Sequence, residues 1–424
     1  MKKILFLIQW YPSVLSANAL CDQRIIAELV KNREYEIHCL SYRPFGVAKE
    51  EILDGVHVHR FRRSLWWNIL IWAKQNRKRR ITSCILFINK LVLHLFQLLT
   101  IPFFPYVEFL ACKRYEHAAR KQFIKTGFDL VISEYHGLDC LYAGRKLKEQ
   151  YKDVPFMAIL WDAFTGKQPM KYLPRSFFDK RMAWAEKKEL SKADRIVAME
   201  SSREYHLAHS TRKRYFDRFV FLDIVGVVKP DISENQNDFI DKDKINVVYA
   251  GILNLPDRDP EYIINCFKHL KQCNKIKLLF FSTGNGIDKL NKLRNDFPGE
   301  ISINGYVGRD LLSRIFDSAD ILLNFGNSNP FMVPSKIFEY MSYCKPIISV
   351  YGIDNDSSND YLKRYPLSVC LDKRMDIESS VTMLQSFFSY ASQKSITFDE
   401  VCSLFNKNTP ASYVSLIEEM MGNV

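Results

Sequence analysis

The chain has 424 residues, of which 47% are hydrophobic and 25% charged, with 16 glycines and 16 prolines. This ordinary globular composition excludes collagen-like, low-complexity and disordered proteins, and the length exceeds what one hydrophobic core usually serves. The formal net charge is +12, and the ten cysteines form no CxxC pair and no Cys/His cluster at metal spacing. We therefore expect two domains, free cysteines in a reducing compartment, and no zinc site.

The chain begins with MKKILFLIQWYPS, in which two lysines precede a short apolar run. The run is too short for a signal peptide, and no small-residue cleavage site follows it. We interpret Ile4 to Ile8 as a buried first strand that leads through a loop into the helix of a βαβ unit.

Much of the positive charge lies in one segment. Between Gly55 and Val107 there is no Asp or Glu, whereas nine residues are basic: Arg60, Arg62, Arg63, Lys74, Arg77, Lys78, Arg79, Arg80 and Lys90. The same segment contains three tryptophans and the apolar run ITSCILFINKLVLHLFQLLTIPFFPYV. Basic side chains, interfacial tryptophans and aliphatic bulk together indicate an element at about 60–112 that lies in an anionic membrane surface.

Three other interpretations of this segment are open. A spanning helix needs about 20 predominantly apolar residues. Ile81 to Ile101 nearly reaches that length, but four polar residues interrupt it: Asn89, Lys90, His94 and Gln97. A basic patch can also bind nucleic acid, although no recognised binding module accompanies this one, and we expect no nucleic acid partner. The last interpretation is a set of helices that pack on the first domain with their charges solvated.

Short β-branched runs alternate with amphipathic stretches, and this alternation occurs twice. It is typical of helices that cover a mainly parallel sheet. The expected strands are 4–8, 35–40, 56–60, 130–133, 156–161, 195–199 and 219–224, then 245–250, 276–282, 301–304, 321–325, 346–350 and 367–371. The polar stretch 229–244 suits a linker. The sequence therefore predicts an α/β chain of two Rossmann-like domains facing across a cleft, with ligands at the carboxyl ends of the strands.

The stretch MVPSKIFEYM, residues 332–341, follows the strand 321–325 and its loop, and it begins a helix that we expect to end at Lys345 and Pro346. Free N–H groups at such a helix start attract an anion, and Lys336 adds a positive charge. Glu339 lies about one turn further along, where a carboxylate can accept hydrogen bonds from a vicinal diol. A nucleoside diphosphate, which joins a phosphate to a ribose, fits both residues. The alternative is an ordinary ion pair between them.

The stretch PSKIFEYMSYCKPIIS resembles the nucleotide-sugar-binding helix of GT-B glycosyltransferases, specifically the retaining enzymes of family 4, and the similarity extends along most of the chain. INVVYAGILNLPDRDPEYIINCF resembles the segment that opens the second domain, which implies Gly251 and Arg258 at the donor pyrophosphate. ISINGYVGRDLLSRIFDSADILLN is similar to the stretch that receives the base, here at Tyr306 and Val307. DLVISEYHGLDC resembles a first-domain strand end where a histidine, here His136, faces the sugar.

The resemblance implies further substrate-binding candidates. Ser335 stands at the start of the nucleotide-sugar helix, and Asp162 follows another strand end in LWDAF. Where the family often has glycines after its first strand, this chain has small residues, Ser13 among them, which still permit a close backbone approach. The closing stretch NKNTPASYVSLIEEMMG fits a C-terminal helix that packs back toward the first domain.

The sequence departs from the family pattern at two other positions, one before the candidate helix and one at its end. The family commonly carries two glutamates with seven residues between them; Glu339 matches the second, but the first position is Phe331. Cys344 occupies the usual place of a glycine at the helix end, and we expect it to alter only the C-cap.

The resemblance implies transfer of a glycosyl group from a nucleoside diphosphate sugar, with uridine favoured, to an acceptor hydroxyl with retention. Arg258 and Lys336 would stabilise the departing diphosphate, and His136 is the third catalytic candidate. We expect no metal cofactor, because DRD at 257–259 is the nearest string to DxD and we interpret its arginine as the functional residue. With the basic segment, this implies a lipid-linked or polysaccharide acceptor in cell-surface glycan synthesis at the cytoplasmic face of the cell membrane.

The expected domains are an acceptor domain at 1–228, a linker at 229–244, a nucleotide-sugar-binding domain at 245–405 and a returning helix at 406–424. Two other functions are open. A UDP-sugar epimerase shares this architecture but generally needs several first-domain acids and histidines in the cleft. A catalytically inactive nucleotide-binding or membrane scaffold is supported chiefly by Phe331.

Overall fold

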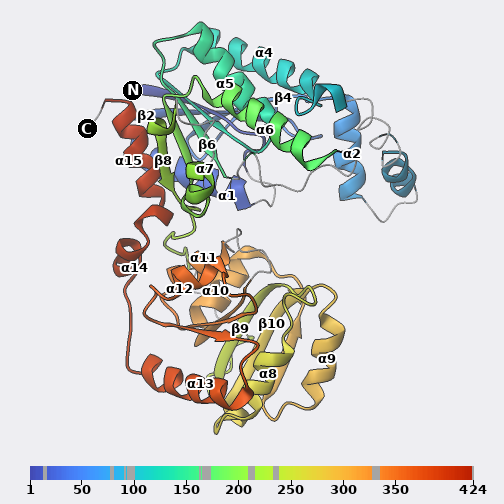
Figure 1. Ribbon diagram of the computed structural model, residues 1–424, viewed down its shortest axis with the longest axis vertical. Helices are drawn as coiled ribbons and strands as arrows, with labels where there is room; N and C mark the ends of the chain where they lie inside the picture. The colour runs from blue at the N-terminus through green and yellow to red at the C-terminus, as the bar shows by residue number, and fades with distance from the viewer. Residues whose placement is uncertain are drawn as a thin grey trace. The chain divides into compact units, whose positions relative to one another are not determined.

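A computed structural model describes residues 1–12, 17–76, 81–89, 92, 101–161, 164, 173–208, 215–232, 238–326 and 335–422. The chain forms two compact units, one made of Met1–Ile224 with Pro410–Val424 and the other of Val225–Thr409. Each unit is built around its own mainly parallel sheet with surrounding helices (Figure 1). The predicted α/β class with two parallel-sheet domains is confirmed.

The sheet of the first unit has the strand order β3-β4-β2-β1-β5-β6-β7-β8. Its strands are β1 (Lys2–Leu7), β2 (Tyr35–Tyr42), β3 (Glu50–Leu53), β4 (Val56–Phe61), β5 (Leu130–Glu134), β6 (Phe156–Leu160), β7 (Arg195–Met199) and β8 (Phe219–Leu222). Every residue of β5 and β6 is buried, as expected for parallel strands covered on both faces. The short edge strand β3, which pairs antiparallel with β4, was not predicted.

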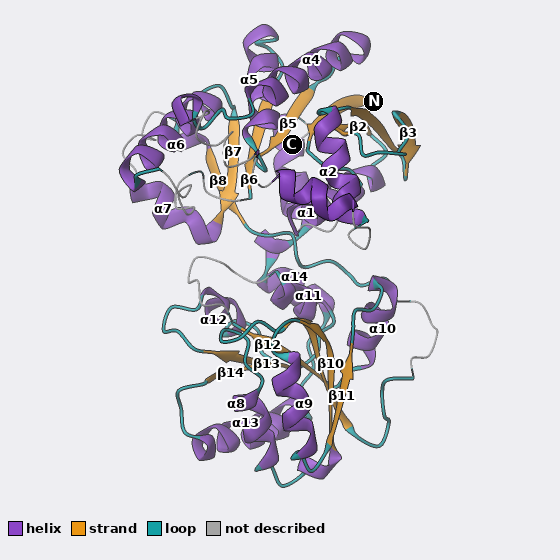
Figure 2. Ribbon diagram, turned by 90° about the vertical axis from the view of Figure 1, so that its right-hand side faces the viewer, coloured by secondary structure: helices purple, strands orange, loops and turns teal. Residues whose placement is uncertain are grey.

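The helices of the first unit are α1 (Ala17–Lys31), α2 (Leu65–Gln75), α4 (Phe109–Thr126), α5 (Leu138–Gln150), α6 (Arg175–Leu190), α7 (Arg203–Ala208) and α15 (Pro410–Met420). Helices α4 and α5 lie side by side and contribute apolar residues to the main core of this unit (Figure 2). The closing helix α15 packs against α1, and its Tyr413 hydroxyl donates to the carbonyl of Asp223 at 2.8 Å.

The second unit has the strand order β11-β10-β9-β12-β13-β14, and its described pairs are all parallel. Its strands are β9 (Ile245–Ile252), β10 (Ile276–Thr283), β11 (Glu300–Asn304), β12 (Ile321–Phe325), β13 (Ile347–Tyr351) and β14 (Ser368–Asp372). Its helices are α8 (Glu261–Lys268), α9 (Ile287–Asn295), α10 (Arg309–Ser318), α11 (Lys336–Ser342), α12 (Ser357–Leu362), α13 (Ile377–Ala391) and α14 (Phe398–Leu404). The strand order is that of a doubly wound dinucleotide-binding sheet.

The basic and apolar segment is only partly described. It includes α2, whose start is capped by Ser64, the side chain of which accepts from the backbone N–H of Trp67 at 3.1 Å. Residues 81–89 are helical, whereas most of 90–100, and with it the middle of the spanning helix considered above, lies outside the described residues. Among the described helices, none combines the length and the apolar character needed to cross a bilayer.

Two buried acidic side chains lie at the edge of the first sheet where its parallel strands end. Asp22 of α1 and Glu134, the last residue of β5, are 2% and 4% exposed. Asp22 also accepts a hydrogen bond from the indole N–H of Trp161 at 3.1 Å. Burial, and then the neighbouring Glu134, raise the pKa of Asp22 well above its ordinary value of 3.8. The folded protein therefore keeps Asp22 protonated at a pH where the unfolded chain has lost that proton.

This proton makes stability depend on pH in a defined direction. As the pH rises above 3.8, the unfolded chain ionises Asp22 while the folded protein does not, so the free energy of unfolding falls until the folded pKa is passed. We expect Asp22→Asn, which keeps the acceptor for Trp161 and can donate to Glu134, to raise the melting temperature at pH 8 but not at pH 4. Thermal melts of both proteins across this range test it, with the exposed Asp153→Asn as control. A destabilised Asp22→Asn protein at pH 8 would contradict the assignment.

Candidate functional site

The carboxyl end of β9 is the topological switch point of the second sheet. Strand β9 pairs with β10 on one side and with β12 on the other, so chain connections leave it in opposite directions. Ligands of open α/β sheets bind in the crevice outside the strand ends at such a point. Gly251 is the last but one residue of β9, and Lys336 is the first residue of α11, the next helix after β12. The topology therefore brings both predicted residues to the expected edge.

The amine of Lys336 is held directly against this strand end. It donates a hydrogen bond to the carbonyl oxygen of Ala250. The side chain is half-buried, and this burial lowers the pKa of its amine; Glu339 acts in the opposite direction and Arg258 lowers the pKa further. Lys336 is thus a desolvated cation with a second cation nearby, an arrangement that an added anion would stabilise.

Gly251 provides the space that Lys336 occupies. A Cβ atom at this position would lie 2.9 Å from Lys336 Nζ and 2.8 Å from the hydroxyl oxygen of Tyr249, both closer than real Cβ contacts. The requirement for glycine here is therefore steric and comes from the lysine that crosses the end of the strand.

Arg258 lies beside the same strand end. Its guanidinium donates to the carbonyl of Ile252 at 3.2 Å, and its backbone N–H donates to Asn254 at 2.9 Å. Burial raises the pKa of Tyr249 to about 12, and the adjacent Arg258 opposes that rise. Arg258 and Lys336 are therefore grouped around the end of β9.

Glu339 does not pair with Lys336, which was the ordinary alternative for these two residues. The ion pair that the structure gives to Glu339 is with Arg309, the first residue of α10, at 3.6 Å. Arg309 was not among the sequence-predicted residues. It joins the loop after β11, which holds Tyr306 and Val307, to α11. Tyr306 is 79% exposed, so its ring is open to a stacking partner.

Helix α11 is shorter than predicted. It runs from Lys336 to Ser342, and Ser335 precedes it without a side-chain capping bond. Cys344 has a φ of +57°, the left-handed conformation that a glycine adopts easily, and its N–H donates to Met341 at 2.9 Å. The helix therefore ends before Lys345 because the backbone reverses at Cys344.

His136 lies at the switch point of the first sheet, where β1 and β5 are neighbours. It is exposed and follows Tyr135, whose ring stacks on that of Phe164 at 3.9 Å. Beside it are buried polar side chains that the sequence analysis missed. The Gln9 amide donates to Asp139 at 2.9 Å, and its backbone N–H donates to Glu134 at 3.1 Å. Gln9 follows the end of β1 by two residues and Glu134 ends β5, so a polar residue at the end of an apolar run is the signal that could have found them.

Three positions of the sequence analysis lie outside the described residues: Ser13, Asp162 and Phe331. Their roles stay predictions, and so does the effect of replacing the first family glutamate.

One group of described side chains could hold a metal ion: Glu36, His38 and His57, whose ligand atoms lie within 4.8 Å of one another. His38 is already bonded to Glu36 at 2.7 Å and to His59 at 3.0 Å. Burial lowers the pKa of His38, and it lowers that of His59 to about 4. The group lies near the starts of β2 and β4, at the edge opposite the carboxyl ends. Glycosyl transfer without a metal stays a prediction.

No protein-family profile matches the sequence, and no curated protein matches it. Solved structures do match. Trehalose-6-phosphate synthase OtsA has a TM-score of 0.60 at 11% identity, over 100% of this chain and 99% of that one. Anabaena Alr3699/HepE, solved with UDP and glucose, has a TM-score of 0.55 at 10% identity over 100% of both chains. Arabidopsis thaliana starch synthase IV, bound to ADP and acarbose, has a TM-score of 0.54 at 9% identity, over 99% and 98%. The chain therefore has the GT-B fold.

We predict that Gly251→Ala destabilises the protein by about 1–3 kcal/mol, the cost of forcing extra volume into a packed site. The new methyl group must displace the Lys336 amine or the Tyr249 hydroxyl. Chemical denaturation measures the change. Gly305→Ala is the matched control, because a Cβ there meets nothing within 4 Å. Equal stability of the two variants would show that Lys336 does not cross Gly251.

Proposed function

We propose that this chain is a retaining glycosyltransferase that moves a sugar from a UDP-sugar to a hydroxyl of a lipid-linked or polysaccharide acceptor. The GT-B fold supports a nucleotide-sugar donor, since Alr3699/HepE binds UDP and glucose and starch synthase IV binds ADP in the same fold. The choice of uridine and the retention of configuration rest on the sequence resemblance to family 4.

The cation pair at the end of β9 is the observation that carries this proposal. Lys336 and Arg258 both contact the end of β9, at the edge where a doubly wound sheet binds its ligand, and Arg258 lowers the pKa of the Lys336 amine. A diphosphate between them would relieve their mutual repulsion. During transfer the bond from the anomeric carbon to the diphosphate breaks, the acceptor oxygen bonds that carbon, and the hydroxyl proton passes to the departing diphosphate. Cations at the diphosphate stabilise the charge that develops there.

Glu339 and the loop after β11 would hold the nucleoside. The carboxylate of Glu339 is half-buried and bonded on one side to Arg309, so it retains acceptor capacity for the two ribose hydroxyls. Tyr306 and Val307, on the loop that leads to Arg309, are the candidates for contact with the base. His136, in the first unit, is the candidate for contact with the transferred sugar.

The proposal of a lipid-linked acceptor rests on the basic segment at about 60–112. Exposed apolar side chains occur there beside the cations: Leu65 is 72% exposed, Phe87 63% and Ile88 50%. Such side chains lower their free energy at a bilayer surface, where anionic lipids attract the basic residues at about 1 kcal/mol each. This supports peripheral contact with the cytoplasmic face of a membrane, where lipid-linked acceptors of cell-surface glycans are found.

Thermal shift with a panel of nucleotides and nucleotide sugars tests the donor. A ligand that binds the native state raises the melting temperature as its concentration exceeds its Kd. We expect UDP and a UDP-sugar to stabilise the protein and GDP to do so less. Release of UDP on addition of membrane extract, followed by the anomeric configuration of the product, tests transfer and retention. A protein that no nucleotide stabilises would overturn the proposal.

We predict that Glu339→Ala lowers donor affinity by about 1.5–3 kcal/mol, the range for a hydrogen bond to a charged group. Lys336→Met should weaken UDP more than it weakens uridine, because it removes the charge that meets the diphosphate. Calorimetric titration with UDP and uridine separates the two effects. Glu378→Ala, an exposed carboxylate in the first turn of α13, serves as control. Unchanged UDP affinity in Glu339→Ala would exclude the ribose assignment.

A further inference from the structure

A groove of about 1110 Å³ lies in the first unit between α2, α4, α5, α6 and the loop before α4. This volume exceeds the range of about 300–1,000 Å³ that drug-sized ligands occupy. Its walls are mainly apolar, and the large side chains that line it include Trp66, Trp67, Leu70, Phe103, Leu110 and Trp184. A groove of this size and lining fits a long hydrocarbon chain better than a nucleotide or a sugar.

Several of these walls are open to solvent. Leu110 is 72% exposed, Phe103 65%, Trp184 45% and Trp66 41%. Trp67, in contrast, is fixed by a ring stack on Trp10 with centroids 5.0 Å apart. Exposed apolar surface that gathers around a groove marks a binding site, because isolated monomers rarely leave such patches uncovered.

Positive charge surrounds the apolar walls. Six of the charged lining residues are cations and one, Glu108, is a carboxylate that is already paired with Arg63. Among the described residues, Arg114, Arg181 and Lys188 form no ion pair with a carboxylate. Lys188 and Arg181 instead lie over the Trp184 ring, 4.8 and 5.3 Å from its centre. The groove therefore suits a ligand that joins an apolar chain to an anion.

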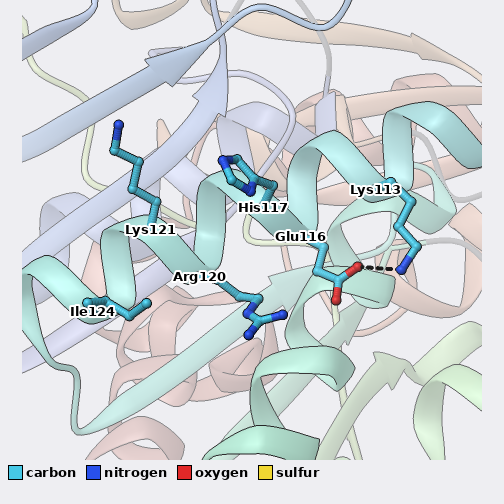
Figure 3. A pocket seen from close by; sticks show the side chains of 6 residues that line it. All are labelled: Lys113, Glu116, His117, Arg120, Lys121 and Ile124. Atoms are coloured by element: carbon cyan, nitrogen blue, oxygen red, sulfur yellow. Dashed lines mark hydrogen bonds and ion pairs between the residues drawn. The ribbon is translucent and has the colours of Figure 1, made fainter.

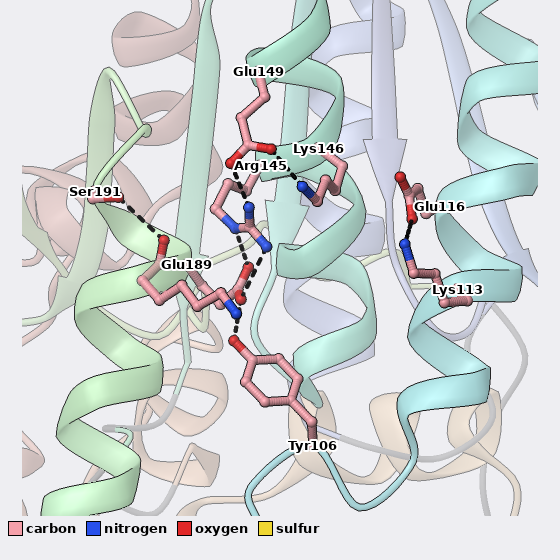
Figure 4. Close-up of polar contacts among 9 residues, drawn as sticks. Tyr106, Lys113, Glu116, Arg145, Lys146, Glu149, Glu189 and Ser191 are labelled. Atoms are coloured by element: carbon pink, nitrogen blue, oxygen red, sulfur yellow. Dashed lines mark hydrogen bonds and ion pairs between the residues drawn. The ribbon is translucent and has the colours of Figure 1, made fainter. Parts of the chain in front are cut away.

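Buried polar contacts hold this arrangement in place. Arg145 donates to Glu189 at 2.8 Å, and the Tyr106 hydroxyl donates to the same carboxylate (Figure 4). Both members of the Arg145–Glu189 pair are buried, so each charge depends on the other. Arg181 donates to two backbone carbonyls of the loop 101–108, at 2.7 and 2.9 Å. These contacts fasten the loop to α5 and α6, which preforms the groove and lowers the cost of ordering it on binding.

The groove borders a second cavity at the carboxyl ends of the first sheet's strands. A smaller cavity of about 270 Å³ shares three lining residues with it: Tyr106, Val107 and Glu108. The smaller cavity is also lined by Gln9, Gly137 and Asp139. Gly137 directly follows His136, the candidate for contact with the transferred sugar. The two cavities are therefore neighbours, and a ligand long enough to pass Tyr106 and Glu108 would bring its polar end to the switch point.

We infer that this groove binds one molecule of a phosphate-bearing long-chain lipid acceptor. Its hydrocarbon chain packs against the tryptophans and Leu110, its phosphate meets cations such as Lys188 and Arg114, and its polar end reaches the cavity beside His136. The inference rests on the proposed function, which gives a lipid acceptor its role. It adds the place where that acceptor binds. It also makes binding depend on the hydrocarbon chain and the phosphate together, so that neither a neutral lipid nor a free phosphate binds equally well.

Equilibrium dialysis of the full-length protein with radiolabelled farnesyl phosphate tests this inference. We expect saturable binding that unlabelled farnesyl phosphate displaces, while farnesol and inorganic phosphate at the same concentration displace at least about tenfold less. Equal displacement by farnesol would reduce the site to a general apolar surface, and equal displacement by inorganic phosphate would reduce it to a basic patch. Either result would overturn the inference.

Substitutions of exposed groove residues, each paired with a control substitution outside the groove, locate the binding site. We expect Lys188→Gln and Leu110→Ser each to weaken farnesyl phosphate at least about fivefold. The control for the first is Lys187→Gln, the preceding exposed residue of α6, which does not line the groove. The control for the second is Ile124→Ser, which is on α4 like Leu110, is also 72% exposed, and lies on the basic face of that helix away from the groove lining (Figure 3). Equal losses in variants and controls would place the lipid elsewhere.

UDP titration of the same samples separates this inference from the proposed function. Binding of UDP without binding of farnesyl phosphate would leave the transferase proposal intact and overturn the groove. Binding of farnesyl phosphate without binding of any nucleotide would overturn the transferase proposal and support the groove as a lipid site. Flotation with anionic phospholipid vesicles is the last arm: loss of vesicle binding in Leu110→Ser, without saturable binding of farnesyl phosphate, would assign the patch to bilayer contact and overturn the inference.

Discussion

The hydrogen bond from the Lys336 amine to the Ala250 carbonyl organises the second unit's candidate site. It requires a residue without a side chain at Gly251, and it holds a partly desolvated cation at the end of the central strand. Arg258 adds a second charge at the same point. The two cations repel each other in the absence of an anion, so the arrangement lowers its free energy when a dianionic group arrives. Packing around β9 is what keeps the charges together until then.

Much of the fold could be predicted because parallel strands buried on both faces leave a plain signal. Runs such as Arg195–Met199 and Ile321–Phe325 have the predicted bounds, and each is directly preceded by an aspartate that lies outside the strand. Strand β3 lacked that signal: it has four residues at a sheet edge, and its side chains alternate between exposed and half-exposed. The early end of α11 depends on the positive φ of Cys344. That backbone conformation is not expected for a residue other than glycine, so the sequence did not predict it.

The candidate site was predictable where a residue's role follows from its position along one element. Lys336 and Gly251 stand at a helix start and a strand end, and both positions can be read from the sequence. Arg309 and Asp22 were missed because their partners, Glu339 and Glu134, come from distant elements whose contact depends on strand order and helix packing. Sequence patterns indicate which edge of a sheet a residue reaches, but not which side chain it will meet there. The groove was missed for the same reason: the sequence analysis noticed two of its tryptophans and Arg63, but many of its other lining residues come from α4, α5 and α6.

Helix α15 belongs to the first unit although the whole second unit separates it from the rest of that unit in the sequence. The backbone therefore passes between the units twice, once after Ile224 and once before Pro410. A protease that cuts either passage once produces two fragments. In both cases the fragments stay associated, because α15 remains bound to the rest of the first unit through contacts such as that of Tyr413. Removing the last fifteen residues would instead uncover the face of α1 that α15 occupies. The first unit thus cannot finish folding on the ribosome until the second unit has been synthesised.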